Sequence, residues 1–165
     1  GRHISGGHYN SAITVSIYLR GIFDKNDVLP YILVQLIAAV SAALVVMRFS
    51  LSGDASSEIL TLGIEAIIAE FIFTFTLAYV VLHVATTEST LDNNYYGAAI
   101  ALVVLVGAMT VGSISLASFN PAVSSALIFS GKISLADSWI HFAPQFIGAV
   151  LATYLYRYSH RTTIQ

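Results

Sequence analysis

Cysteine is absent from the 165-residue chain, and only 10% of its residues are charged. The lack of cysteine excludes a disulfide framework, thiol catalysis and cysteine-ligated metal sites. A soluble domain is usually about 25% charged. The scarcity of charge, with 56% hydrophobic residues and a mean hydropathy of +0.78, therefore indicates an integral membrane protein. The net charge of −2, without a basic cluster, argues against a nucleic-acid partner.

Long apolar segments predict four membrane-spanning helices. A helical span needs roughly 20 apolar residues. The expected spans are Val28–Met47, Ile59–Val84, Tyr96–Ser113 and Ser138–Tyr156. We therefore expect an all-α, multi-pass membrane protein in a lipid bilayer.

Two Asn-led segments of the chain are versions of one another. Asn10-Ser11-Ala12-Ile13-Thr14 and Asn120-Pro121-Ala122-Val123-Ser124 each open a short apolar run. The register then continues without a gap, so that Gln35 matches Gln145. A gapless match of this length indicates an internal duplication.

Each Asn-led run is too short to cross a membrane and is expected to form a re-entrant half-helix. Asn is a strong N-cap residue, and Pro at the first helical position is pre-organised for a helix. Ser11 replaces Pro in the first copy, which predicts a looser approach to that helix. The alternative is an ordinary capped helix after a loop. Three spans separate the copies, so they should enter from opposite faces as an inverted repeat.

Half-helices that meet at mid-membrane would point their N-termini at each other. Each N-terminus carries roughly +0.5 charge, which opposes the passage of cations and protons. The Asn10 and Asn120 amides could donate hydrogen bonds to a passing oxygen atom. Such a site favours neutral, hydrogen-bonding solutes. The sequence offers no catalytic constellation, so we expect no enzyme activity.

The distribution of Lys and Arg predicts the orientation. Five of these residues fall on one side of the predicted spans and two on the other, which places the first half-helix and the C-terminus on the cytoplasmic side of the membrane. The two groups are Arg2, Arg20, Lys25, Arg157 and Arg161, and Arg48 and Lys132. We expect residues 1–165 to form a single domain, with 1–50 the end of the first repeat and 59–160 the second.

Four motifs closely resemble the aquaporin (major intrinsic protein) family. They are Ser5-Gly6-Gly7-His8-Tyr9-Asn10-Ser11-Ala12-Ile13-Thr14, Glu70-Phe71-Ile72-Phe73-Thr74-Phe75, Ser118-Phe119-Asn120-Pro121-Ala122 and Trp139…Pro144…Gly148-Ala149. The resemblance implies a right-handed six-helix bundle with one pore per subunit, usually a homotetramer, that passes water or a small neutral solute without a cofactor.

Relative to that family, the two spans before the first Asn box are missing, so four spans of six are expected. The chain also starts without an initiator Met, at Gly1. We expect a partial sequence, the alternative being a protein that lacks these helices.

The outer constriction departs from the family pattern. Val123 stands where the family carries Arg after the second box, and the other constriction positions fall on Ala108 or Gly107 and on Ala117. An apolar constriction lacks the strong donor and the charge of a guanidinium. We expect a pore for water or a larger uncharged solute. The alternative is a non-conducting structural subunit of a larger membrane complex, and a coupled transporter is a weaker third hypothesis.

Two further residues are expected to support the loops. Glu70 lies mid-span, where an unpartnered acid is costly, so it should accept hydrogen bonds from backbone N–H groups before a half-helix. The alternative is a snorkelling surface acid. His8 should order its loop or line the cytoplasmic vestibule, with pH gating as the alternative.

The remaining histidines and the aromatic residues at span ends predict packing. His83 and His141 are expected to be packing residues and His160 to be solvated. No His pair has a metal-ligand spacing supported by nearby acids, so no metal site is expected. Aromatic residues near span ends predict interface anchors: Tyr31, Tyr95, Tyr96, Trp139, Tyr156 and Tyr158.

Overall fold

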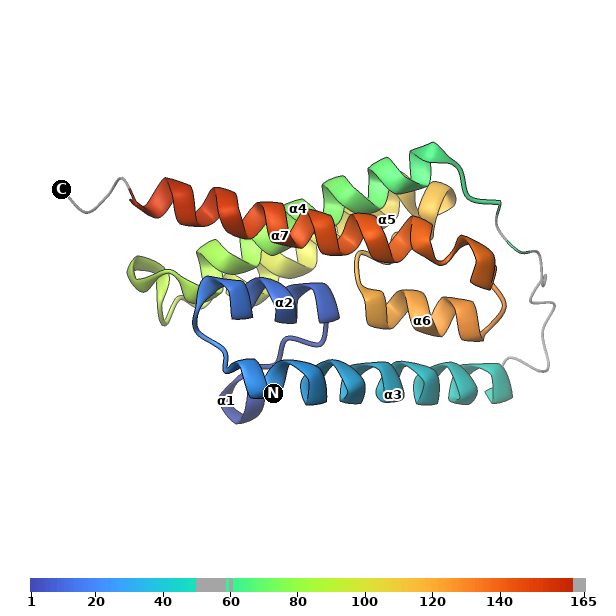
Figure 1. Cartoon of the computed structure of the whole chain (residues 1–165), viewed down its shortest axis with the longest axis horizontal. Helices are drawn as coiled ribbons and strands as arrows, with labels where there is room; N and C mark the ends of the chain where they lie inside the picture. The colour runs from blue at the N-terminus through green and yellow to red at the C-terminus, as the bar shows by residue number, and fades with distance from the viewer. Residues whose placement is uncertain (50–58, 60, 162–165) are drawn as a thin grey trace.

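The computed structural model describes residues 1–49, 59 and 61–161, which contain helices and no β-strand (Figure 1). The α-helices are α1 (Arg2–Ser5), α2 (Ser11–Arg20), α3 (Lys25–Phe49), α4 (Ile64–Thr86), α5 (Tyr96–Ser115), α6 (Pro121–Phe129) and α7 (Trp139–Arg161). Short 3₁₀ turns cover Glu88–Thr90 and Leu135–Asp137. The all-α prediction is confirmed.

Among the described residues, three helices are long and apolar enough to cross a membrane: α3, α4 and α5. The helix α4 begins at Ile64, after Gly63 as its N-cap, rather than at Ile59. Residue 60 of that predicted span lies outside the described residues, as does residue 50 at the end of the predicted first repeat.

The fourth predicted span corresponds to α7, which has the length of a span but is not in the apolar set. Its 23 residues include His141, Gln145 and Thr153, and these polar side chains are buried in the protein. At Gly148, an added Cβ would lie 2.8 Å from the Phe71 carbonyl oxygen. The helices α4 and α7 therefore approach closely through a small residue, as membrane helices often do.

The two half-length helices form as predicted and lie end to end between α3 and α7 (Figure 1). The helix α2 has 10 residues and α6 has 9, about half of what a membrane span needs. Gly21 ends α2 with a left-handed backbone (φ 90°), a conformation that glycine adopts without a Cβ clash.

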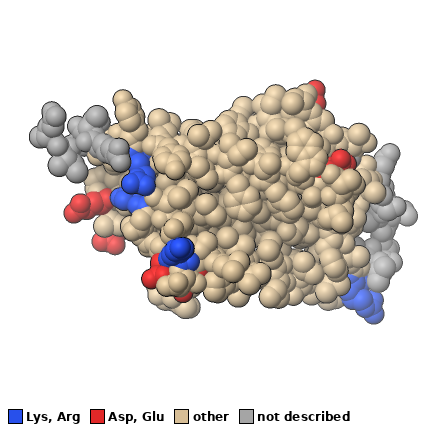
Figure 2. Space-filling model, viewed as in Figure 1, with Lys and Arg blue, Asp and Glu red and all other residues tan. Residues whose placement is uncertain are grey.

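Apolar side chains cover much of the surface. Ile37 on α3 is 66% exposed and Met109 on α5 is 80% exposed. Figure 2 shows charged side chains gathered toward the two ends of the molecule, with an uncharged surface between them. A surface of this kind suits contact with lipid rather than with water.

Aromatic residues at the span ends divide into two groups. Trp139 and Tyr158 are 57% and 71% exposed, as interface anchors are. The prediction is wrong for Tyr156, which is 1% exposed. Its hydroxyl hydrogen-bonds with Thr87 Oγ1 at 2.9 Å. Tyr156 therefore packs inside the bundle.

Candidate functional site

Asn10 and Asn120 cap the two half-helices and also bind each other's loops. Asn10 Oδ1 accepts hydrogen bonds from the backbone N–H groups of Ala12 (3.0 Å) and Ile13 (3.4 Å). Asn120 Oδ1 accepts one from Ala122 N at 2.9 Å. The Nδ2 atom of each Asn donates a hydrogen bond to the loop before the other half-helix.

Those crossing bonds are equal in length. Asn10 Nδ2 donates to the Phe119 carbonyl oxygen and Asn120 Nδ2 to the Tyr9 carbonyl oxygen, both at 2.9 Å. Tyr9 and Phe119 share a left-handed backbone, with φ of 52° and 47°. This conformation is costly for bulky residues, so the two loops store similar strain. The N-termini of α2 and α6 therefore meet in a nearly symmetric junction.

Glu70 of α4 holds the loop before α6. It is fully buried. Its carboxyl group accepts hydrogen bonds from Ser118 N (3.1 Å) and Phe119 N (2.8 Å). Ser115 Oγ and Gln145 Nε2 donate to it as well, each at 2.7 Å. Four donors offset the desolvation of a buried acid, so a surface position is excluded for this side chain. Any role in conduction stays a prediction.

His141 and Gln145 extend this polar cluster from α7. Gln145 Nε2 also lies 2.9 Å from Ser124 Oγ, and His141 Nδ1 lies 3.1 Å from the same hydroxyl. His141 Nδ1 is 4.0 Å from Glu70 Oε2. His141, which the sequence predicts to be a packing residue, therefore connects α7 to the second half-helix.

A matching cluster supports the first half-helix. Ser11 Oγ donates to Gln35 Oε1 at 2.8 Å, and Gln35 Nε2 donates to Thr14 Oγ1 at 2.9 Å. The looser approach expected from Ser11 is not found. The φ and ψ angles are −147° and 120° at Asn10, against −157° and 116° at Asn120. The hydrogen bond from the Ser11 hydroxyl to Gln35 of α3 therefore holds the start of the first half-helix in place, as a proline ring would.

His8 lies in the loop before α2, outside the membrane-spanning helices. Its Nδ1 is 3.3 Å from Thr14 Oγ1, and its backbone N–H donates to the Tyr31 hydroxyl at 3.3 Å. Its ring packs edge-on against Phe23, with centroids 4.9 Å apart. Burial lowers the pKa of His8 below the ordinary value of a histidine, because the charged form is desolvated.

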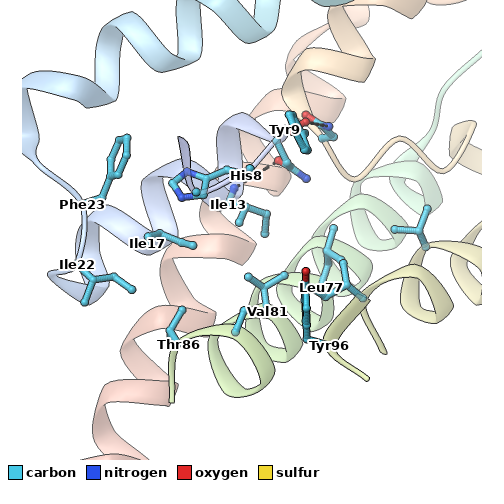
Figure 3. Close-up of a pocket in the computed structure, with 17 residues that line it drawn as sticks. His8, Tyr9, Ile13, Ile17, Ile22, Phe23, Leu77, Val81, Thr86 and Tyr96 are labelled. Carbon is cyan, nitrogen blue, oxygen red and sulfur yellow. Dashed lines mark hydrogen bonds between the residues drawn. The ribbon is translucent and has the colours of Figure 1, made fainter. Parts of the chain in front are cut away.

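A cavity of about 550 Å³ leads to the junction. Figure 3 shows Ile13 and Ile17 of α2 on one side of it and Leu77 and Val81 of α4 on the other. It is lined by loop residues, aliphatic side chains and both Asn residues: Gly6, Gly7, His8, Tyr9, Asn10, Ile13, Ile17, Ile22, Phe23, Leu77, Val81, Ala85, Thr86, Tyr96, Ile100, Val104 and Asn120. The walls are therefore mostly apolar, with polar groups at the junction.

The three predicted constriction residues do not line this cavity. Ala108 is exposed on α5, one helical turn beyond Val104. Val123 is 42% exposed in the first turn of α6. Ala117 is half-buried with φ of 48°. Gly107, the alternative to Ala108, faces the rings of Phe73 and Phe119 and not the surface. A constriction at these residues stays a prediction.

Part of the cavity lining is not predictable from the sequence. Tyr96, expected to be an interface anchor, lines the cavity with Ile100 and Val104. These residues follow at intervals of four, so they share one face of α5. The interval of four residues indicates a shared helix face. It does not tell whether that face contacts a cavity, lipid or another helix.

Comparisons with known proteins agree with this geometry. The family model for major intrinsic protein matches residues 1–156. Aquaporin NIP1-4 of Oryza sativa subsp. japonica is 31% identical over 93% of this chain and 57% of its own length. Aquaporin Z of Photorhabdus laumondii is 29% identical over 94% of this chain and 73% of its own. Glycerol uptake facilitator protein-like 6 of Lactiplantibacillus plantarum is 28% identical over 93% and 74%.

This chain thus spans little more than half the length of the rice relative. The family model, however, matches nearly all of the chain, including both Asn-led segments. The chain belongs to the major intrinsic protein family.

Proposed function

We propose that the protein is a passive membrane channel for water or a small neutral solute. The observation that carries the proposal is the reciprocal pair of 2.9 Å hydrogen bonds from Asn10 and Asn120, at the inner end of an apolar cavity. The relatives, which are named as aquaporins and a glycerol uptake facilitator, support it.

Two opposed helix N-termini provide the selectivity. Each carries roughly +0.5 charge on its free N–H groups, so the junction repels cations and protons. An apolar wall offers no charged group to replace the water around an ion. A neutral solute incurs a much smaller desolvation free energy when it enters. The Asn10 and Asn120 amides offer hydrogen bonds at the point where the solute is most dehydrated. Transport of this kind needs no catalytic group and no cofactor.

The outer constriction at Ala108, Ala117 and Val123 makes the channel wider and more apolar than a guanidinium-lined one. Val123, in the first turn of α6, is 42% exposed, so its apolar side chain is accessible rather than packed in the interior, as this proposal requires. A constriction without Arg favours solutes larger than water, such as polyols, over water alone.

The proposed assembly is a homotetramer in which residues 1–165 contribute to one bundle domain. The first half-helix enters the membrane from the cytoplasmic side, and the C-terminus lies on the same side. Arg157 Nη donates to the Leu19 carbonyl oxygen at 3.2 Å, which joins the ends of α2 and α7 on one side. Lys25 begins α3 and Arg48 lies in its last turn, so these two cations lie at opposite ends of a 25-residue helix. The bias of positive residues toward the α2 and α7 ends supports this orientation.

Stopped-flow light scattering on proteoliposomes of the full-length protein tests the proposal. We expect permeability to water and glycerol well above that of empty liposomes. Permeability equal to that of empty liposomes for water, glycerol and urea would overturn it. It would instead favour the alternative, a non-conducting structural subunit, which co-purification with unrelated membrane subunits would then test.

A further inference from the structure

Two histidines far apart in the sequence meet where α4 and α7 end. His83 lies one turn before the end of α4, and His160 is next to the last residue of α7. Their ring centroids are 5.2 Å apart. Both rings contact Tyr156, with centroids 4.9 Å from His83 and 4.0 Å from His160. Neither histidine lines the cavity described above.

The tautomer of both rings is set by their own helices. His83 Nδ1 is 2.9 Å from the Tyr79 carbonyl oxygen, and His160 Nδ1 is 2.9 Å from the Tyr156 carbonyl oxygen. A carbonyl oxygen only accepts hydrogen bonds, so each Nδ1 must carry the proton. In the neutral rings, each Nε2 therefore presents a lone pair.

The same contacts direct both lone pairs away from the helices. In an imidazole, Nε2 stands opposite the bond between Cγ and Nδ1. In both residues that bond faces the residue's own helix, so Nε2 is the ring atom farthest from it. Within the described part of the chain, neither Nε2 has a hydrogen-bond partner.

The pair shares two features with metal-binding histidines. A metal-binding histidine usually donates its other ring N–H to a carbonyl or carboxylate, which fixes the tautomer. Two imidazoles on one tetrahedral ion, with Zn–N bonds of about 2.0–2.1 Å, place their ring centroids roughly 5 Å apart. The 5.2 Å separation of His83 and His160 matches that spacing.

We propose that His83 and His160 form a binding site for a divalent transition-metal ion of the zinc class, through their Nε2 atoms. Imidazole nitrogen suits zinc, copper and nickel, whereas magnesium and calcium prefer oxygen. The described residues contain no group of three or more His, Cys, Asp and Glu that could hold a metal. Water therefore completes the coordination. The bound ion joins the ends of α4 and α7.

The positive charge of Arg20 opposes binding of the ion. The Arg20 guanidinium lies over the Tyr156 ring, with its carbon 5.1 Å from the centroid. The same Tyr156 ring stacks on His160, with centroids 4.0 Å apart, so the cation lies close to the proposed site. The site is therefore an exchangeable one of moderate affinity rather than a permanent structural centre.

Titration calorimetry with zinc chloride on the purified full chain tests the proposal. We expect one Zn²⁺ per chain. His83→Ala and His160→Ala should each weaken binding by at least about tenfold. His3→Ala is the matched control, because His3 is exposed on α1 and should leave the affinity unchanged. Unchanged affinity in both site variants, or loss of binding in the His3 variant, would overturn the proposal.

A second measurement uses only the wild-type chain, so it does not depend on the folding of variants. Diethyl pyrocarbonate modifies accessible imidazole nitrogens, and mass spectrometry locates the modification. Zn²⁺ should protect His83 and His160 together and leave His3 reactive. Equal modification of His83 and His160 with and without Zn²⁺ would contradict the site.

Discussion

Asn10 and Asn120 each hydrogen-bond the carbonyl oxygen of the residue that precedes the other, at 2.9 Å in both directions. Each side chain therefore does two things at once, since its oxygen caps its own half-helix and its nitrogen binds the opposite loop. The junction between the two copies of the repeat depends on both residues equally.

Asn120→Ala should lower the free energy of unfolding by about 1–2 kcal/mol, because a lost N-cap costs about 0.5–2 kcal/mol. It should also reduce solute permeability, since the Tyr9 carbonyl oxygen loses its partner. Unfolding in detergent and proteoliposome flux measure the two effects. Asn94→Ala, at an exposed loop position, is the control and should change neither quantity.

Glu70→Gln should destabilise the fold by about 1–3 kcal/mol for each buried donor that it leaves unsatisfied. The amide nitrogen of Gln cannot accept the hydrogen bonds that one carboxyl oxygen accepts now, and an unsatisfied buried donor costs about 1–3 kcal/mol. Thermal unfolding measures the melting temperature of this variant, with Glu65→Gln, at an exposed position on the same helix, as the control. Equal melting temperatures for the two variants would contradict the supporting role of Glu70.

Gly148→Ala should destabilise the contact between α4 and α7 by about 1–3 kcal/mol, as overpacking does. The new Cβ would meet the backbone at 2.8 Å from Phe71 O and 3.0 Å from Phe75 N, and backbone atoms cannot rotate away. Gly112→Ala is the matched control on α5, where nothing lies within 4 Å. That variant should be neutral or more stable, since Ala favours a helix over Gly.

Val123→Arg should lower glycerol permeability more than water permeability. A guanidinium narrows the proposed constriction and competes for hydrogen bonds with the solute. The ratio of the two permeabilities in proteoliposomes measures the effect, with Val123→Ala as the control that keeps the position apolar. An unchanged ratio in the Arg variant would place the constriction elsewhere.

His8 should make the stability depend on pH in a defined window. Burial lowers its pKa in the folded state, so the unfolded chain binds the proton more readily. Above the ordinary histidine pKa of about 6.5, both states are neutral and His8 contributes no pH dependence. As the pH falls below this value, the free energy of unfolding should decrease. Unfolding curves from pH 8 to pH 5 should show a smaller decrease in His8→Asn than in the wild type.

Much of the fold follows from local signals in the sequence. Asn10 and Asn120 predict the starts of α2 and α6 because an Asn side chain satisfies N–H groups that no helix can satisfy itself. The apolar run from Val28 to Met47 predicts α3 because backbone groups in lipid must be paired within the helix.

Long-range relationships could not be read in the same way. His83 and His160 are 77 positions apart in the sequence, and only the packing of α4 against α7 brings them together. The position of Tyr156 near a span end predicts an interface anchor. Its burial depends instead on a contact with Thr87, which lies at the end of another helix. The Ser11–Gln35 hydrogen bond likewise depends on the position of α3 beside α2. Tertiary packing determines these three contacts, and the composition of the sequence does not show which helices pack together.

The most direct test of the central claim measures solute and proton flux in the same proteoliposomes, with light scattering for glycerol and an internal pH dye for protons. A channel governed by the Asn10–Asn120 junction should pass glycerol much faster than empty liposomes while its proton flux stays at the empty-liposome level. Glycerol flux equal to that of empty liposomes, or proton flux that rises with the amount of protein, would contradict the account.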